Sequence, residues 1–415
     1  MIWKRAVGLV PLVMLLGVAF SADAAPFSNV AYRRIEVQDV ATDEFFPVAL
    51  WYPTLAAPAS LFLTGSLSGC RLPTMLCRSI SFEMQVASNA PPADGKFGLI
   101  VISHGAGGFA LNHRDLAMEL ASHGYVVAAP THPRGKDNDV SGIGVWVGRP
   151  RQVSLVIDAV LKDAALGPHV QRERIGAVGH SNGGYTALAL AGAKPNPQAV
   201  IAHCRQHPDD IRFCSSGGAA TREAVRKISD IPDMRDPRIR AIVLMAPNVA
   251  PFTDDALARV AVPVRVYGAE RDDLTVARYH TERLATALPP ETEYLLIKGA
   301  GHFSFVASFP WALRIVVGEA ARDPKGFDRD AMHAVMNTEI VGFFDRKLPP
   351  GEKAPDKRAQ PMPSRDSRDP NWGQNRGPEA WLQWPRTSRF NGPGLALLAP
   401  AAERERWTAA PTRAA

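Results

Sequence analysis

The sequence lacks the features that would mark a membrane-spanning or nucleic-acid-binding protein. The apolar run from Ala6 to Phe20 is too short for a comfortable membrane span. The net charge of +6 and the isoelectric point of about 9.2 suggest an anionic partner. However, eleven Lys/Arg stand against seven Asp/Glu between Glu352 and Arg413, so most of the excess lies at the end of the chain. The rest is nearly neutral, which argues against nucleic acid as a partner. No internal repeat is visible.

Cysteine is also scarce, with four residues in 415. They form two close pairs, Cys70 with Cys77 and Cys204 with Cys214, and we expect local disulfides if the protein is exported. The spacing of the neighbouring histidines matches no established metal pattern, so we expect neither a metal nor another cofactor. The alternative left open is a zinc cluster of His203, Cys204, His207 and Cys214.

The N-terminal segment has the pattern of an export signal. Lys4 and Arg5 precede the apolar run, and the small-residue site Ala22-Asp23-Ala24 follows it. We therefore expect residues 1–24 to be a cleaved signal peptide and the protein to be periplasmic or secreted. An uncleaved anchor is the alternative, and no cysteine near the end of the run offers a lipid attachment point.

The chain is long enough for one large α/β domain with extra segments or for two ordinary domains, and we interpret residues 25–348 as a single α/β domain. Arg33 to Val40 and Phe46 to Tyr52 alternate like two strands joined by a turn at Asp43-Glu44, which predicts an antiparallel edge. Six short continuous apolar runs follow, as is typical of parallel strands buried on both faces. These runs are Gly98 to Ser103, Tyr125 to Pro130, Arg174 to Gly179, Arg240 to Ala246, Val262 to Gly268 and Glu293 to Lys298.

Segments of helical spacing separate these runs, so the sequence predicts a doubly wound, mostly parallel sheet. Residues 53–95 and 193–237 are rich in turn residues, and we interpret them as insertions, the second one before the sixth strand. Residues 349–415 are rich in Pro and Arg, which predicts a disordered tail. The predicted helices are Leu111 to Ser122, Arg151 to Leu161, Gly184 to Ala191 and Val276 to Leu288.

The sharpest chemical signal is Gly179-His180-Ser181-Asn182-Gly183-Gly184, which fits the pattern G-x-S-x-G. A strand-like run precedes it and a helix-like run follows it. A nucleophilic serine has to project from a strained strand-to-helix turn, where glycines prevent clashes. We expect Ser181 to be the nucleophile of such a turn, and an ordinary tight turn is the alternative.

An acyl-transfer site also needs hydrogen-bond donors for the tetrahedral oxyanion. The backbone N–H of Asn182, directly after the serine, is one candidate. The other is the N–H of Ala106 in the glycine-rich loop Ser103-His104-Gly105-Ala106-Gly107-Gly108, which follows a predicted strand. The alternative is that this loop is only a flexible turn. Where a serine turn of this kind is catalytic, the acid and the histidine follow the serine along the chain. His104 precedes Ser181, so we expect it to shape the loop rather than act as the base.

By this chain order, the acid and the general base lie C-terminal to Ser181. His302 lies in a glycine-flanked loop after the last predicted strand, and we expect it to be the general base. The loop after the preceding strand offers three carboxylates. We rank Asp272 first as the acid that orients the base, then Asp273, then Glu270. We assign no role to Arg149, His132 or Tyr185.

These motifs resemble the branch of the α/β-hydrolases that contains predicted dienelactone hydrolases and platelet-activating-factor acetylhydrolases. The resemblance covers about residues 30 to 348. It rests on Val48 to Pro53, Val101 to Gly108, Leu120 to Pro130, the turn at 179–184 and Gly299 to Phe303. It implies an α/β-hydrolase fold, Ser181 and His302 as nucleophile and base, and the amides of Ala106 and Asn182 as the oxyanion hole.

The sequence departs from this branch at two places. The best-known dienelactone hydrolases have a cysteine where Ser181 stands. Acetylhydrolases of the platelet-activating-factor type place the acid after the strand that follows the nucleophile helix, and here that strand runs from Ile239 to Met245 without a carboxylate. The loop Gly268 to Asp272 instead resembles the acid loop of bacterial cutinases and polyester hydrolases.

The sequence as a whole indicates a cofactor-independent serine esterase that acts through an acyl-enzyme. We expect a small-molecule ester or lipid substrate with a short-chain or lipid-like acyl group. An amidase or peptidase with the same three residues and a non-catalytic binding protein on the same fold are the alternatives. The basic tail would serve a weak association with a membrane surface or the cell wall. Oligomeric state does not follow from the sequence.

Overall fold

The computed structural model describes residues 27–65, 80–133, 144–216, 231–350 and 404–405. The predicted signal peptide, Cys70 and Cys77 lie outside the described residues. So does the predicted disordered tail, except for Pro349, Pro350 and the two-residue strand β11. No helix within the described part of the chain is long and apolar enough to span a membrane.

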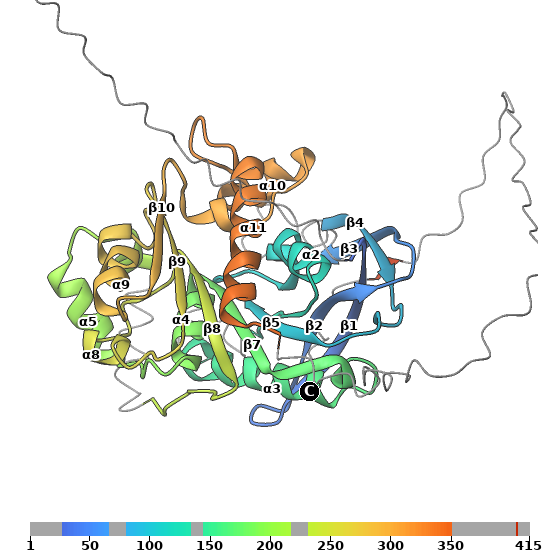
Figure 1. The fold of residues 1–415 in the computed structure, drawn as a ribbon. Coiled ribbons are helices and arrows are strands. Elements are labelled where there is room, and N and C mark those ends of the chain that lie inside the picture. Colours follow the sequence, from blue (N-terminus) through green and yellow to red (C-terminus); the bar gives the residue numbers. More distant parts are fainter. Residues whose placement is uncertain (1–26, 66–79, 134–143, 217–230, 351–403, 406–415) are drawn as a thin grey trace, which may run out of the picture.

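The strands of the described residues form one sheet in the order β10-β9-β8-β7-β5-β6-β2-β1-β4-β3-β11 (Figure 1). The six runs expected as parallel strands are β5 to β10, and all neighbours among them pair in parallel, which confirms the prediction. Their bounds are β5 Phe97–Ser103, β6 Tyr125–Pro130, β7 Val170–His180, β8 Ile239–Met245, β9 Val264–Ala269 and β10 Glu293–Ile297.

The antiparallel edge is also present. Strand β1 (Asn29–Asp39) pairs with β2 (Glu44–Thr54), and the turn between them includes Asp43 at φ 55°. The described parts of the 53–95 segment extend this edge rather than forming an irregular loop. They make β3 (Ala59–Gly65) and β4 (Ile80–Ser88), an antiparallel pair, and β3 also pairs with β11 (Arg404–Glu405). The alternation of buried Phe82, Met84 and Val86 with exposed Ser81, Glu83 and Gln85 is the period-2 signal that the turn residues around it obscured.

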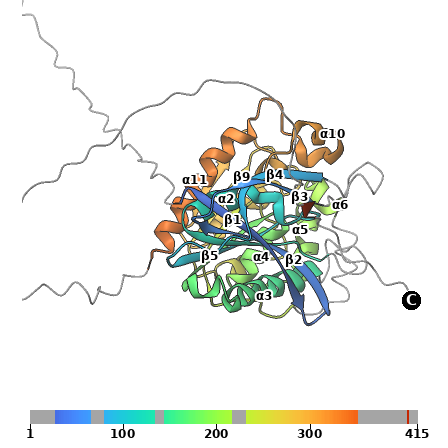
Figure 2. The same ribbon diagram turned by 90° about the vertical axis from the view of Figure 1, so that its right-hand side faces the viewer.

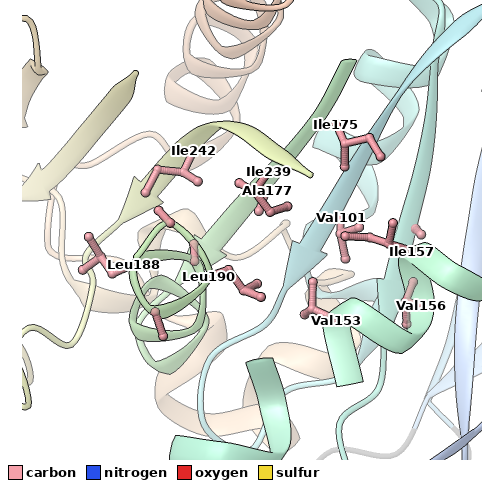
Figure 3. Close-up of a cluster of buried hydrophobic side chains, with 14 of the residues drawn as sticks. Val101, Val153, Val156, Ile157, Ile175, Ala177, Leu188, Leu190, Ile239 and Ile242 are labelled. Atoms are coloured by element: carbon pink, nitrogen blue, oxygen red, sulfur yellow. The ribbon is translucent and has the colours of Figure 1, made fainter. Parts of the chain in front are cut away.

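Helices cover both faces of the sheet (Figures 1 and 2). On one face α3 and α4 pack over an apolar cluster that includes Val153, Ile157 and Leu188 (Figure 3). On the other face α2 and α11 cover a second cluster. The helical elements are η1 (Ala110–His113), α2 (Arg114–Ser122), η2 (Gly144–Gly148), α3 (Arg149–Lys162), η3 (Gly167–His169), α4 (Asn182–Leu190), α5 (Pro197–Gln206), α6 (Ile211–Ser216), α8 (Asp254–Leu257), η4 (Ala277–Tyr279), α9 (Thr281–Ala287), η5 (His302–Phe305), η6 (Trp311–Leu313), α10 (Arg314–Val317), η7 (Gly318–Ala321) and α11 (Arg329–Lys347).

Because helices cover both faces, the central strands appear in the sequence as continuous apolar runs. Every residue of β5 and β6 is buried, because helices exclude water from both faces of the central strands. The four predicted helices are present as α2, α3, α4 and α9, with short η segments beside α2 and α9. The long helix α11 was not predicted. It packs Met336, Ile340 and Phe344 onto the core.

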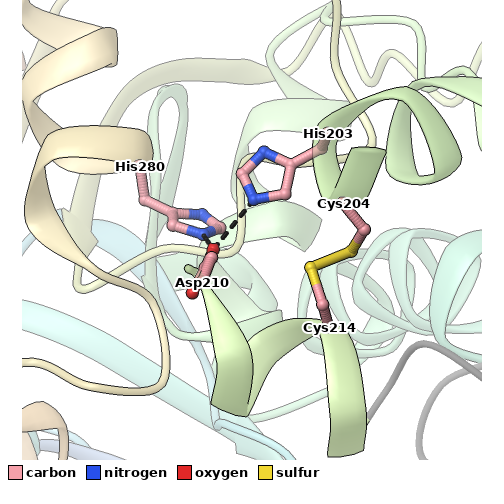
Figure 4. The surroundings of a disulfide bond; sticks show 5 residues. All are labelled: His203, Cys204, Asp210, Cys214 and His280. Atoms are coloured by element: carbon pink, nitrogen blue, oxygen red, sulfur yellow. Dashed lines mark hydrogen bonds and ion pairs between the residues drawn. A yellow bond between two sulfur atoms is a disulfide. The ribbon is translucent and has the colours of Figure 1, made fainter. Parts of the chain in front are cut away.

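The 193–237 segment carries the disulfide Cys204–Cys214, which confirms the expected bridge (Figure 4). It joins α5 to α6 and closes the loop between them. Three residues at the α6 side of this loop bind the acid loop and the residues that follow it. Asp209 accepts a hydrogen bond from Tyr279 at 2.6 Å, Asp210 pairs with His280, and Arg212 contacts Asp273 at 2.7 Å.

Replacing both cysteines by serine should lower the free energy of unfolding by about 2–3 kcal/mol, because a loop of this length gains that much conformational freedom in the unfolded chain. Urea unfolding of the Cys204→Ser/Cys214→Ser variant beside the wild type measures the difference. Equal stability of the two proteins under oxidising conditions would show that the bridge contributes nothing.

Candidate active site

Ser181 sits at the tip of a strained turn between β7 and α4. Its backbone has φ 54° and ψ −117°, a region that residues with side chains rarely adopt. The turn is held by its own carbonyl, which accepts the N–H groups of Gly184, Tyr185 and Asn248 at 2.9, 3.2 and 3.0 Å. The neighbouring contacts therefore over-determine this conformation, as expected of a nucleophile turn.

Two glycines make the turn sterically feasible. A Cβ on Gly179 would lie 2.0 Å from the carbonyl oxygen of Gly183, and a Cβ on Gly183 would lie 1.9 Å from that of Ser103. Side-chain carbons do not approach backbone oxygen this closely. The G-x-S-x-G pattern thus reflects contacts with the end of β5 as well as the shape of the turn itself.

His302 and Asp272 form a buried pair at the carboxyl edge of the sheet. The loops after β9 and β10 bring them there, because these two strands are parallel neighbours. The Nδ1 atom of His302 lies 2.9 Å from Oδ2 of Asp272, and their side chains are 4% and 1% exposed. This is the geometry in which a carboxylate fixes the tautomer of an imidazole.

Asp272 is itself held by the residues that follow it. The N–H groups of Leu274 and Thr275 bind Oδ1 at 2.9 and 2.8 Å, and the Thr275 hydroxyl donates to Oδ2 at 2.9 Å. Burial tends to raise the pKa of Asp272, but the charge and hydrogen bond of His302 and these N–H groups outweigh it, so the pKa is lowered. The carboxyl is therefore ionised at neutral pH.

Thr275 is a site residue that sequence reasoning missed. Its signal was present in Asp272-Asp273-Leu274-Thr275, because an Asp side chain that accepts the N–H groups two and three residues further along is a common local motif. The two lower-ranked acids have other partners. Asp273 is exposed and pairs with Arg212 at 2.7 Å, and Glu270 accepts the Gly299 N–H at 2.8 Å.

His180, the residue before Ser181, links the strained Ser181 turn to the loop that carries His302. Its Nε2 donates to the carbonyl of His302 at 2.9 Å, and the two imidazole centroids are 4.9 Å apart. Burial is the largest of the effects that lower the pKa of His180 well below its usual value, so this imidazole is neutral. The end of β7 therefore holds the loop that carries His302 next to Ser181.

The glycine-rich loop after β5 passes directly beside Ser181, since a Cβ on Gly105 would lie 3.3 Å from the Ser181 Cβ. Three groups bind the Gly105 carbonyl: His104 Nδ1 at 2.7 Å, the Gly108 N–H at 3.2 Å and Arg149 Nη2 at 3.4 Å. In a trans peptide the C=O and the following N–H point in opposite directions. These contacts thus fix the direction of the Ala106 N–H.

His104 uses both ring nitrogens within this scaffold. Its Nδ1–H donates to Gly105, and its Nε2 accepts the N–H of His132 at 3.1 Å. Burial, followed by the nearby Arg149, lowers its pKa well below the usual value, so the ring is neutral. These bonds give it the loop-shaping place expected from the sequence.

Arg149, to which the sequence assigned no role, is buried at the start of α3. Its Nη1 donates to the His104 carbonyl at 2.6 Å, so one guanidinium binds two successive carbonyls of the loop. Burial lowers its pKa to about 9, which leaves it cationic at neutral pH. An arginine at a helix start carries no sequence signal for this task. The other two residues left without a role also brace the site: His132 binds Ser103, and Tyr185 binds the Trp146 carbonyl.

Within the described residues, one group has ligand atoms close enough to hold a metal: His203, Asp210 and His280 (Figure 4). Asp210 Oδ2 lies 2.8 Å from His203 Nε2 and 3.2 Å from His280 Nε2. However, His280 Nδ1 accepts the N–H of Val249, which puts the ring proton on Nε2, facing Asp210. This tautomer offers no lone pair to a cation, and the disulfide occupies both cysteines of the zinc cluster considered from the sequence.

Known proteins are similar to this chain in both sequence and fold. The family model "Platelet-activating factor acetylhydrolase, isoform II" matches residues 39–142. The chain is 22% identical to the platelet-activating factor acetylhydrolase of Cavia porcellus over 354 residues, covering 74% of this chain and 70% of that protein. The ferulic acid esterase of Streptomyces cinnamoneus superposes with a TM-score of 0.54 at 21% identity, covering 84% of this chain and 96% of that one.

The chain has the α/β-hydrolase fold, and its sequence is similar to a platelet-activating factor acetylhydrolase. Another relative of this α/β-hydrolase is the cutinase est2 of Thermobifida alba, 25% identical over 218 residues, or 52% of this chain. The chain spans about half the length of that cutinase, 55%. The resemblance stated from the motifs is thereby confirmed, and the doubly wound fold expected for it is the one observed.

A serine-directed fluorophosphonate should label this α/β-hydrolase at Ser181, and Asp272→Asn should slow labelling by ~10³–10⁴-fold because the base loses its tautomer and orientation. Asp273→Asn is the matched control and should react at the wild-type rate, since Asp273 faces Arg212. Mass spectrometry of the labelled peptide identifies the residue that reacts, and the labelling rates of the two variants identify the carboxylate on which the reaction depends. Slower labelling in Asp273→Asn with a normal rate in Asp272→Asn would contradict the assignment.

Proposed function

We propose that this α/β-hydrolase is a serine esterase that cleaves carboxylic esters through an acyl-enzyme intermediate. The observation that carries the proposal is the strained Ser181 turn joined by His180 to the loop of the buried His302–Asp272 pair. Residues 25–348 form the catalytic unit in this proposal, and no cofactor takes part. The names of the relatives, which are cutinase, acetylhydrolase and esterase, support ester cleavage over other acyl transfers.

In the first half-reaction the Ser181 Oγ attacks the ester carbonyl carbon while His302 Nε2 takes its proton. The carbonyl π bond opens to an oxyanion, which the N–H groups of Ala106 and Asn182 stabilise. The oxyanion then collapses, the C–O bond to the alcohol breaks, and His302 returns the proton to the leaving oxygen. Water repeats these steps on the acyl-enzyme and releases the carboxylic acid. Asp272 stays ionised throughout and stabilises the imidazolium.

The substrate class is a short-chain or lipid-like acyl ester, and the setting is periplasmic or secreted. The Cys204–Cys214 bridge supports the setting, because disulfides persist in oxidising compartments. An amidase or peptidase uses the same three residues, so the nature of the leaving group has to be tested directly.

Hydrolysis of p-nitrophenyl esters from acetyl to palmitoyl, beside the matched p-nitroanilides, should show ester turnover with a chain-length optimum. Ser181→Ala should lose it, because the acyl-enzyme no longer forms. Turnover of the anilides at a kcat/KM equal to that of the esters would favour the amidase. Full ester activity in Ser181→Ala would contradict the proposed nucleophile.

Arg149→Lys should lower kcat on p-nitrophenyl acetate by about tenfold with little change in KM, because a single ammonium cannot hold two carbonyls and the oxyanion donor loses its alignment. The matched control is Arg151→Lys, two residues along α3. Arg151 binds Asp39 at 2.7 Å and should give the wild-type kcat. An equal loss in both variants would indicate a general effect on the helix rather than on the loop.

A further inference from the structure

The segment that carries His302 is held by side chains rather than by secondary structure of its own. We call residues 302–308 the base segment, and beyond the single turn η5 it is irregular. Five of its backbone carbonyls each accept a hydrogen bond from an imidazole or guanidinium group. The pairs are His180 with the carbonyl of His302, His333 with Ser304, His113 with Phe305, Arg329 with Val306, and Arg114 with Ser308.

These donors come from β7, α11, η1 and α2, so elements far apart in the sequence converge on one stretch of backbone. The base segment is also held by the Ser304 hydroxyl, which donates to Asp323 at 3.0 Å, and by the Ala307 N–H, which binds the Asn112 carbonyl at 2.8 Å. The position of the catalytic imidazole therefore depends on the protonation of its side-chain donors, since a ring nitrogen without hydrogen cannot donate to a carbonyl.

His333 differs from the other two imidazoles because both of its nitrogens face acceptors. Its Nε2 lies 2.7 Å from the Ser304 carbonyl, and its Nδ1 contacts the carboxylate of Asp115. A neutral imidazole has one N–H and cannot donate to both. The ring is therefore an imidazolium, with Asp115 as its counter-charge.

The surroundings favour that charge state. Burial tends to lower the pKa of His333, but the hydrogen bond and the charge of Asp115 outweigh it, and the pKa is raised. Burial likewise acts to raise the pKa of Asp115, yet His333 brings it well below its usual value. The other charged or titratable groups around the pair are Arg114 on α2, His113 on η1 and Arg329 on α11.

The two other imidazole donors are neutral and do not share this behaviour. His113 donates only through Nδ1, and burial lowers its pKa to about 4. His180 donates only through Nε2. Each can keep its bond as the pH rises, because a neutral ring still has one N–H. Among the three imidazole donors, His333 alone loses a bond on deprotonation.

We propose that the Asp115–His333 pair positions the catalytic base: protonated His333 holds the Ser304 carbonyl in place, and its deprotonation at alkaline pH releases the base segment and lowers turnover. The proposal rests on the proposed function of His302. His333 is a positioning residue here and touches no reacting atom. After the ring loses its proton, the remaining N–H stays with the carboxylate, and a lone pair then faces the Ser304 carbonyl.

The direction in which pH changes the activity follows from the raised pKa of His333. The contribution of His333 is fully present below the unfolded-state value, which is about 6.5 for histidine, and is lost as the pH rises through the higher folded-state value. His333 therefore sets the decline of activity on the alkaline side.

The decisive variant is Asp115→Asn, which keeps His333 but removes its counter-charge. The alkaline decline in the rate of Ser181 labelling by a fluorophosphonate, and in kcat on p-nitrophenyl acetate, should disappear, because a neutral ring can give its one N–H to the Ser304 carbonyl when Nδ1 no longer faces a carboxylate. His333→Gln should react ~10-fold more slowly at pH 7, because its amide serves only one of the two acceptors. The alkaline decline in labelling rate and kcat should also be absent from His333→Gln, because an amide does not titrate. His113→Gln is the matched control on the same segment and should keep the decline where the wild type has it.

An independent readout is the ring nitrogen shifts of His333 in the ¹⁵N-histidine-labelled Ser181→Ala protein, with thermal unfolding at each pH to show that every variant is folded. The inference is supported if the His333 ring is doubly protonated at pH 7 and loses its proton over the pH range in which the labelling rate declines. A neutral His333 at pH 7, or a decline that persists in Asp115→Asn, would overturn it. Normal labelling without ester turnover would instead count against the proposed function alone, because labelling needs no ester substrate.

Discussion

The close approach of Gly183 to the carbonyl of Ser103 is the contact on which the site depends. It brings the start of α4 against the end of β5, so the strained serine turn and the glycine-rich loop meet at one point of the carboxyl edge. A single methyl group at position 183 would separate them. Parallel pairing of β7, β8, β9 and β10 then places the acid and base loops at the same edge.

Around that point the molecule uses buried charge to hold irregular backbone. Arg149 binds two carbonyls of the glycine-rich loop, Arg329 and the His333 imidazolium bind carbonyls of the base segment, and Asp272 binds two N–H groups of its own loop. Buried charges are costly unless they are well hydrogen-bonded. Their concentration here is consistent with a site whose loops have to be rigid but cannot be helix or strand.

The parallel strands, the helices between them and the elbow were predictable because their signals are local. Continuous apolar runs, helical spacing and the G-x-S-x-G pattern each occupy a few consecutive residues. The hairpin of β3 and β4 was missed because turn residues around it dominated the composition, although Phe82 to Val86 alternates. Helix α11 was missed, and with it His333, since no chemistry-bearing motif surrounds it.

The sequence by itself determined the fold class, the serine turn and the short range of residues that contains the acid, because these follow from spacing along the chain. Only the tertiary structure paired His302 with Asp272 rather than with Asp273 or Glu270, placed Arg149 on the glycine-rich loop, and joined Asp115 to His333 across more than two hundred residues. Those choices depend on which side chains converge in space. Local sequence cannot encode that convergence, because the contacts come from elements that meet only when the sheet and its helices assemble.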